Sequence, residues 1–276
     1  MSYALLCNSE AEVSPIEKRE TLMPNVYDDR QVAQRYDAAR ALPAATLDLW
    51  MHTLQQLIPP PINRIVDVGC GTGRFTEALA TTFGCATLGI DPAGPMLQAA
   101  RATHGSAMHW VQAAAQAMPV VSDAVDMVWL SQVMHHLQDW AVVCRELHRI
   151  LRSGGYMVVR NGTQETNAMM SWLRCFPEAF AVEQRRTPSR QGMIDQITVH
   201  AYDLVVLRTV WQAFASSAGA YYDKIAQRGL SSLISISDDA FAAGLQRLRV
   251  WVNAQPVHVP VYEPVDVFVF AAARQG

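Results

Sequence analysis

The chain has few of the features that mark nucleic-acid-binding, disulfide-stabilised or membrane-spanning proteins. Only two of its 276 residues are lysines, Lys18 and Lys224, and no basic run is long enough to follow a phosphate backbone. Its five cysteines are odd in number, widely spaced and without a C-x-x-C pair, which argues against a disulfide framework and a zinc site. The most apolar stretch, residues 257–273, is interrupted by two prolines and two acids. We therefore expect neither a nucleic-acid partner nor a membrane span.

The rest of the composition is that of an ordinary globular protein. Hydrophobic residues make up 50% of the chain and charged residues 17%, and the net charge is −3. Residues 1–20 hold several acids and no long apolar core, so they do not resemble a secretory signal, and we expect a cytoplasmic protein. Residues 1–22 lack periodicity and are expected to form a flexible arm, followed by a single domain over 23–276.

Residues 64–74 predict a strand, a tight turn and a helix. The β-branched run 64–68 carries Asp67 and leads into the turn. Alternate positions of the turn are glycines: Gly69, Gly71 and Gly73. Glycines allow positive φ and let a ligand lie against the main chain, while the following helix offers free N–H groups. A dinucleotide fingerprint G-x-G-x-x-G would need a glycine at Arg74, so the turn predicts a nucleotide-type ligand of another kind. A corner without any ligand is the alternative.

Apolar strands and helices alternate after this turn. Further strands are expected at 86–90, 108–112, 125–130, 156–161, 204–210 and 257–272. Two helices, 211–228 and 238–252, are expected before the last strand. Continuous apolar strands that alternate with helices predict an α/β, doubly wound sheet. Ligands of such sheets gather at the carboxyl ends of the strands, so the turn after 125–130 should face the same crevice as the glycine turn.

Asp91 ends the strand 86–90 and lies eighteen residues beyond Gly73. An acid at this point of a doubly wound fold accepts hydrogen bonds from ribose hydroxyls, which suits a carboxylate with two strong acceptors. The alternative is a helix N-cap with Pro92 at the first helical position, and the two roles are compatible.

Two adjacent histidines, His135 and His136, follow the strand 125–130. Imidazole titrates near neutrality, so either could serve as a general base. Adjacent side chains point in different directions, so at most one is expected to face the site, and packing or solvent exposure is the alternative. Asp139 alone lies at ligand spacing, so we expect no metal site. Asn161 ends the next strand, where substrate groups could reach it.

Together these motifs resemble the class I S-adenosylmethionine (SAM) dependent methyltransferases, whose first motif is similar to residues 66–73. The resemblance implies a seven-stranded, mostly parallel sheet with the last strand antiparallel. It also implies an N-terminal helical cap over 23–61, a lid insertion over 162–200, and SAM as the cofactor.

The resemblance further implies which residues meet the cofactor. Residues 36–40, YDAAR, resemble a run that closes over the methionine end of SAM, where Arg40 would pair with the carboxylate. A solvated helix face explains this run without function. Ala114 stands where relatives carry an Asp that receives the adenine amino group, a loss of about 1–3 kcal/mol if nothing replaces it. The implied cofactor-binding set is Tyr36, Arg40, Asp67, Gly69, Gly71, Gly73, Asp91, Pro92, Met96, Ala114, Ala115, Gln116 and Ser131.

The implied activity is in-line transfer of the SAM methyl group to an O, N or C nucleophile of a small-molecule substrate. His135 or His136 would act as the base, and Tyr27 and Asn161 would position the acceptor. Attack at another sulfonium carbon, including by SAM's own amino group, is an alternative that would release methylthioadenosine. A second alternative is a non-catalytic SAM-binding partner subunit.

Overall fold

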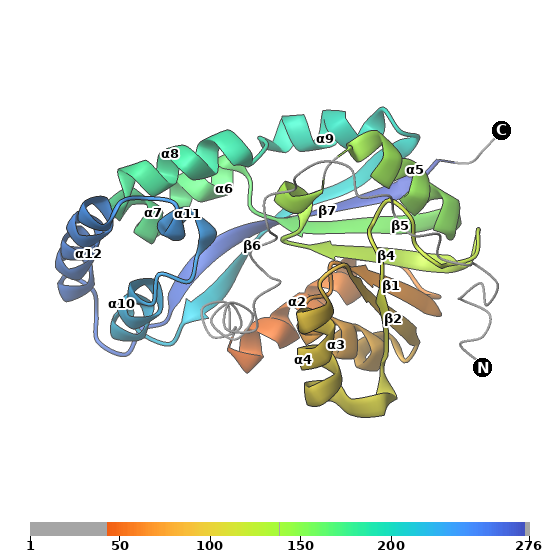
Figure 1. Ribbon diagram of the computed structural model, residues 1–276, viewed down its shortest axis with the longest axis horizontal. Helices are drawn as coiled ribbons and strands as arrows, with labels where there is room; N and C mark the ends of the chain where they lie inside the picture. The colour runs from red at the N-terminus through yellow and green to blue at the C-terminus, as the bar shows by residue number, and fades with distance from the viewer. Residues whose placement is uncertain (1–42, 138, 274–276) are drawn as a thin grey trace.

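The computed structural model describes residues 43–137 and 139–273 of the chain (Figure 1). The predictions for Tyr27, Tyr36 and Arg40, for the flexible arm and for most of the helical cap lie outside these residues. The helical segment expected after Pro43 is present as α2 (Ala44–Leu57). Within the described ranges, no helix combines the length and the apolar character that a membrane crossing requires.

Seven strands form one sheet in the order β3-β2-β1-β4-β5-β7-β6. They are β1 (Arg64–Val68), β2 (Ala86–Asp91), β3 (His109–Gln112), β4 (Val125–Ser131), β5 (Leu151–Asn161), β6 (Tyr202–Ala215) and β7 (Val261–Ala272). β7 runs antiparallel to both β5 and β6, while the other neighbours pair in parallel. This confirms the predicted α/β sheet, mostly parallel with an antiparallel last strand.

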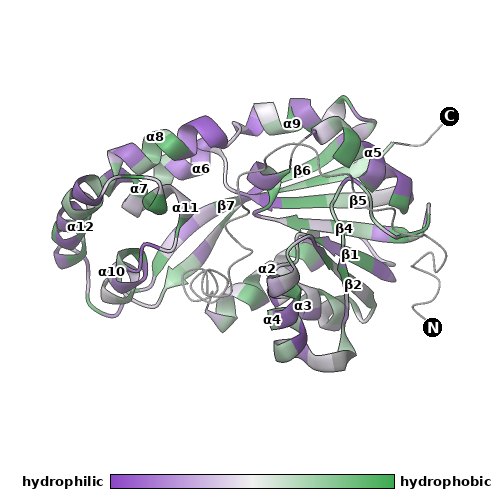
Figure 2. Ribbon diagram, viewed as in Figure 1, coloured by the Kyte–Doolittle hydropathy of each residue, from purple (hydrophilic) through white to green (hydrophobic). Residues whose placement is uncertain are grey.

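Helices cover both faces of the sheet (Figure 1). Those that flank it, besides α2, are α3 (Arg74–Phe83), α4 (Gly94–His104), α5 (Trp140–Ile150) and α9 (Arg190–Thr198). One face packs against α5 and α9 through residues such as Leu147 and Met193, and the other against α2 and α3 through Trp50 and Leu79. The central strands are hydrophobic along most of their length, as strands buried on both faces must be (Figure 2).

Six further helices gather beyond one end of the sheet (Figure 1), and we call them the helical lobe. They are α6 (Gln164–Met169), α7 (Ser171–Cys175), α8 (Pro177–Arg186), α10 (Ala218–Ala226), α11 (Ser231–Ile234) and α12 (Asp238–Asn253). The lobe has its own hydrophobic cluster around Phe176, Tyr221 and Leu248. Gly244 of α12 makes room for this packing, because a Cβ there would lie 2.1 Å from Cδ1 of Phe176. The lobe thus draws on two segments of the chain, one on each side of β6.

The predicted helix over 211–228 is wrong in its first part, because β6 continues to Ala215. This end of β6 pairs with the start of β7, where Ala215 faces Val261. Pairing with a partner strand outweighs a local pattern that fits either element. The helix begins only at Ala218, where the Ser217 side chain accepts a hydrogen bond from a backbone N–H of the first turn.

Two other boundaries also differ from the prediction. The strand expected at 156–161 begins earlier, at Leu151, and the register between β5 and β4 is irregular at this point. The last strand begins at Val261 instead of residue 257, after His258, whose φ of 73° is unsuited to a strand.

Candidate functional site

A cavity of about 190 Å³ lies at the edge of the sheet where β1, β4 and β5 end. The glycine turn and the start of α3 form one side of it, and β6, β7 and the helical lobe form the other. This is the edge at which doubly wound sheets bind ligands. The predicted site residues that line the cavity are Asp67, Gly69, Gly71, Ser131, His135 and Asn161. Those that do not line it are Gly73, Asp91, Pro92, Met96, Ala114, Ala115, Gln116 and His136.

The three glycines of the turn all have positive φ but serve different purposes. A Cβ on Gly69 would lie 2.4 Å from Cγ1 of Val133, and one on Gly73 would lie 2.3 Å from the Trp110 ring. These two glycines therefore allow close packing behind the turn. A Cβ on Gly71, whose φ is 56°, would meet no described atom within 4 Å. Gly71 is thus the position at which the main chain lies open to the cavity.

Asp91 holds the glycine turn in place. Its Oδ2 accepts a hydrogen bond from the Gly71 N–H at 2.9 Å, and its Oδ1 accepts one from the Ala93 N–H at 2.8 Å. Burial raises the pKa of this carboxyl group, and these two hydrogen bonds oppose the rise. Pro92 is exposed and precedes α4, which starts at Gly94, so the alternative that placed Pro92 at the first helical position is wrong.

His104 braces the same turn from its outer side. Its Nε2 lies 3.2 Å from the carbonyl oxygen of Thr72, and its Nδ1 lies 2.8 Å from a carboxylate oxygen of Glu77. The imidazole also packs against Trp110, with ring centroids 5.8 Å apart. Sequence reasoning missed His104, because only the fold brings the end of α4 against Thr72, which lies 32 residues earlier in the chain.

Asp67 is a buried carboxyl group on the cavity wall. It is 2% exposed, and its Oδ2 accepts a hydrogen bond from the Thr76 hydroxyl at 2.6 Å. Burial raises the pKa of Asp67 to about 7, the charge of Asp91 adds to the rise, and the hydrogen bond from Thr76 opposes it. A cationic ligand group in the cavity would favour the ionised form.

The ends of β4 and β5 meet at Arg160. Its Nη1 donates to the Ser131 hydroxyl at 3.0 Å, and its Nη2 donates to Oε1 of Gln212 at 2.7 Å, across β7. The guanidinium also lies 4.6 Å from the Trp50 ring centroid. Gln132 follows Ser131 with a φ of 58°, a conformation that non-glycine residues adopt mainly where the surroundings enforce it. Gln132 and Gln212 both line the cavity, and neither was predicted.

Asn161 carries a buried, unsatisfied acceptor beside the cavity. The residue lines the cavity, its side chain is buried, and Nδ2 donates to the Gly162 carbonyl oxygen at 2.8 Å. Its Oδ1 is buried and accepts no hydrogen bond from any residue that the structure describes. An unmet buried acceptor costs about 1–3 kcal/mol, which a ligand N–H group would recover.

The two histidines differ in position. His135 lines the cavity, while His136 is exposed. Their ring centroids lie 3.9 Å apart. The expectation that no more than one histidine faces the site agrees with this placement, and the role of His135 as a base stays a prediction.

The residues expected around adenine are not brought into the cavity. Met96 and Ala115 are buried with 3% and 6% exposure, Ala115 within the core between the sheet and α5. Ala114 and Gln116 are half-buried on the loop after β3. Their roles as cofactor contacts stay predictions. Within the ranges 43–137 and 139–273, no cluster of three or more histidine, cysteine or acidic residues is arranged to hold a metal ion.

Glu263 is a buried acidic cavity residue that sequence reasoning did not single out. In the sequence it is one of the acids that interrupt an apolar stretch. Its position on a cavity wall depends on the antiparallel insertion of β7, because this direction brings the start of β7 to the edge where the parallel strands end. No local signal marks that position.

Comparison with known proteins finds methyltransferases. Residues 66–159 match the family model described as a methyltransferase domain. A trans-aconitate 2-methyltransferase of Azoarcus sp. (strain BH72) is 27% identical over 200 residues, which cover 69% of this chain and 78% of the relative. A malonyl-acyl-carrier-protein O-methyltransferase of Legionella pneumophila is 37% identical over 99 residues, 35% of each chain. These two and two further curated relatives are matched over 28% to 78% of their own length, three of the four over less than two thirds.

Solved structures extend the likeness in fold beyond the matched segment. The structure of a SAM-dependent methyltransferase from Thermotoga maritima has a TM-score of 0.55 at 16% identity and covers 90% of this chain and 98% of its own. The segment 66–159 contains the glycine turn, Asp91 and the two histidines. Residues 66–159 are thus similar in sequence to a methyltransferase domain, and the fold of the chain is that of solved methyltransferase structures.

Proposed function

We propose that the protein binds SAM at the glycine turn and transfers its methyl group to a small-molecule acceptor in the adjoining cavity. The observation that carries the proposal is Gly71, which has positive φ, is held by Asp91 and has no described atom within 4 Å of where a Cβ would lie. A main chain that is open at this point gives a ligand direct access to the turn and to the start of α3.

The residues around the turn fit the polar groups of SAM. Asp67 and Asn161 both line the cavity, and the Asp67 carboxylate and the unsatisfied Asn161 Oδ1 can both accept hydrogen bonds from the amino group of the methionine part. Each oxygen of Asp91 accepts one backbone hydrogen bond and keeps a second lone pair for a ribose hydroxyl. Bound SAM would supply a methyl group already activated by the positive sulfur.

The acceptor would occupy the part of the cavity next to the helical lobe. Trp172, Leu173 and Phe214 supply apolar walls there, which exclude water from the reacting atoms. His135 stays the candidate base on the wall formed after β4, with Asn161 as a positioning group. We keep the roles proposed for Tyr27, Tyr36 and Arg40, which lie in the N-terminal segment outside the described residues. We also propose a cytoplasmic location.

Product analysis tests the proposal. The protein is incubated with SAM and a fractionated metabolite mixture, and the nucleoside product is identified by mass spectrometry. Release of S-adenosylhomocysteine with an acceptor is the expected result. Methylthioadenosine would instead establish the alternative reaction at another sulfonium carbon. SAM binding without any turnover would favour the non-catalytic partner subunit and contradict methyl transfer.

A further inference from the structure

Strand β7 carries two buried acidic residues that differ in their hydrogen-bond partners. Asp266 is 0% exposed and Glu263, three residues earlier, is 4% exposed. Alternate residues of a strand point to opposite faces, so Glu263 lies on the face of Val265 and Asp266 on the other. Val265 lines the cavity, and so does Glu263.

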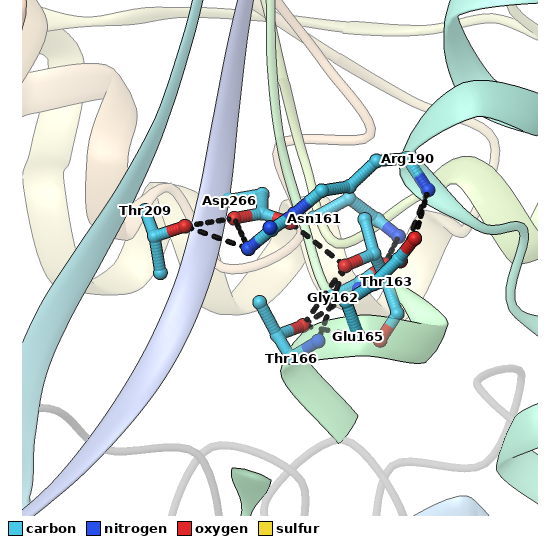
Figure 3. Close-up of polar contacts among 8 residues, drawn as sticks. All are labelled: Asn161, Gly162, Thr163, Glu165, Thr166, Arg190, Thr209 and Asp266. Atoms are coloured by element: carbon cyan, nitrogen blue, oxygen red, sulfur yellow. Dashed lines mark hydrogen bonds and ion pairs between the residues drawn. The ribbon is translucent and has the colours of Figure 1, made fainter. Parts of the chain in front are cut away.

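Asp266 is fully neutralised by its neighbours (Figure 3). Its two oxygens accept four hydrogen bonds: from Nε and Nη2 of Arg190 at 2.7 and 3.0 Å, and from the hydroxyls of Thr163 and Thr209, each at 2.7 Å. Arg190 begins α9, and Thr163 caps α6. This acid therefore ties the segment after β5 to the sheet, and its role is structural.

Glu263 has no comparable set of partners. Its Oε1 accepts a hydrogen bond from the Tyr221 hydroxyl at 2.6 Å, and its Oε2 accepts none from the residues in the described ranges. Tyr221 is itself fixed, because its oxygen accepts a hydrogen bond from the Trp172 N–H at 3.0 Å. Lys224 lies near enough to favour the ionised form of Glu263, while its Nζ donates to the Phe214 carbonyl oxygen at 3.0 Å. One oxygen is thus held and the other is left for the cavity.

A buried carboxylate with so few partners is costly to the fold. Burial raises the pKa of Glu263 to about 7, and the Tyr221 hydrogen bond and Lys224 only partly oppose this rise. A glutamine would keep the hydrogen bond from Tyr221 and avoid the cost of burying a charge. An ionisable group kept in a cavity under these conditions favours a binding role.

Glu263 also lies away from the cofactor side. The order of the strands places three steps between β1, which carries the glycine turn, and β7, or about 14 Å at about 4.8 Å for each step. The last residue pair between β5 and β7 joins Asn161 to Asp266, so Glu263 extends beyond the end of β5. The acceptor must lie between the glycine turn and the lobe, which is where Oε2 of Glu263 is available.

We propose that Glu263 binds a hydroxyl or amino group of the methyl acceptor through its Oε2, so that the acceptor is an alcohol, phenol or amine and not a carboxylic acid at this point. The inference rests on the proposed methyl transfer. The hydroxyl or amino group of the acceptor donates a hydrogen bond to Oε2, while Tyr221 keeps the carboxylate in place. The names of the two curated relatives above specify trans-aconitate and a malonyl group, which are both carboxylic acids. The proposal therefore predicts a different class of acceptor for this chain.

A set of three probes of matched size tests the proposal: benzyl alcohol, benzylamine and benzoate. Each is titrated by calorimetry at pH 8, where a carboxyl group with the pKa of Glu263, about 7, is mostly ionised. The titrations use the wild-type protein and E263Q, with and without S-adenosylhomocysteine. The control is E178Q, a substitution of an exposed glutamate on α8.

The wild-type protein should bind the alcohol and the amine more tightly than benzoate. E263Q should bind the amine about tenfold or more weakly, since a hydrogen bond to a charged group is lost, and should bind benzoate more tightly. E178Q should behave as wild type. Equal affinities of wild type and E263Q for the amine, or tighter binding of benzoate than of both donors by wild type, would overturn the proposal.

Unfolding measurements separate binding from structure. E263Q should be at least as stable as wild type at pH 8, because the glutamine keeps the Tyr221 hydrogen bond and is neutral. A large loss of stability would show that Glu263 is a structural acid like Asp266 and would overturn the proposal. If S-adenosylhomocysteine does not bind, the proposed function fails, while the titrations without it still report on Glu263.

Discussion

Replacing Gly71 by alanine separates the ligand role of the glycine turn from its role in the fold. The alanine would keep a φ of 56° and place its Cβ in space that no described atom occupies. The left-handed conformation costs a non-glycine residue about 1–2 kcal/mol, which corresponds to about 2–4 °C in Tm for a domain of this size. No further loss of stability is expected, because the methyl group meets no described atom within 4 Å. It would, however, stand where the account places SAM against the main chain.

Gly84 provides a matched control. It ends α3 with a φ of 60°, and a Cβ there also meets nothing within 4 Å, but Gly84 does not line the cavity. G71A and G84A should therefore lose similar stability in thermal unfolding. Calorimetric titration with S-adenosylhomocysteine should show affinity reduced by at least about tenfold for G71A, about 1.4 kcal/mol, and unchanged for G84A. Equal affinities of the two variants would refute the placement of the ligand at Gly71.

Two further substitutions test the buried acids. The pKa of Asp67 in the folded protein, about 7, lies above the ordinary 3.8, so its contribution to stability is full below pH 4 and is lost as the pH rises through 7. Over this range the free energy of unfolding of D67N should therefore rise relative to that of wild type, by up to about 4 kcal/mol, and D67N should bind SAM more weakly. Parallel pH profiles of unfolding for the two proteins would contradict this. D266A should lose about 3–5 kcal/mol in denaturant unfolding, because it leaves Arg190 without its buried partner, whereas D203A, at an exposed site on β6, should lose little. A loss below about 1 kcal/mol for D266A would show that this anchor is dispensable.

The sequence predicted the sheet and the glycine turn because their signals are local. Buried parallel strands are continuous apolar runs, and three closely spaced glycines mark a turn whatever surrounds it. The same pattern could not separate the two uses of the glycines. Whether a Cβ would meet Val133 or open space is decided by packing across the sheet.

The acceptor side of the cavity was predicted less well. The segment 211–215 was assigned to a helix, and only its pairing with β7 makes it a strand that places Gln212 and Phe214 on the cavity wall. Glu263 could not be distinguished from Asp266 in the sequence, because both are acids in an apolar run. Their difference lies in the side chains that approach each of them from distant helices.

The structure of the complex with S-adenosylhomocysteine tests the central claim most directly. The account predicts that the amino group of the methionine part lies within about 3.2 Å of Asn161 Oδ1 and close to Asp67, with the chain of the ligand against Gly71. It also predicts that the sulfur faces the part of the cavity that leads to Glu263. A ligand bound elsewhere on the molecule, or with its sulfur turned away from this cavity, would contradict the account.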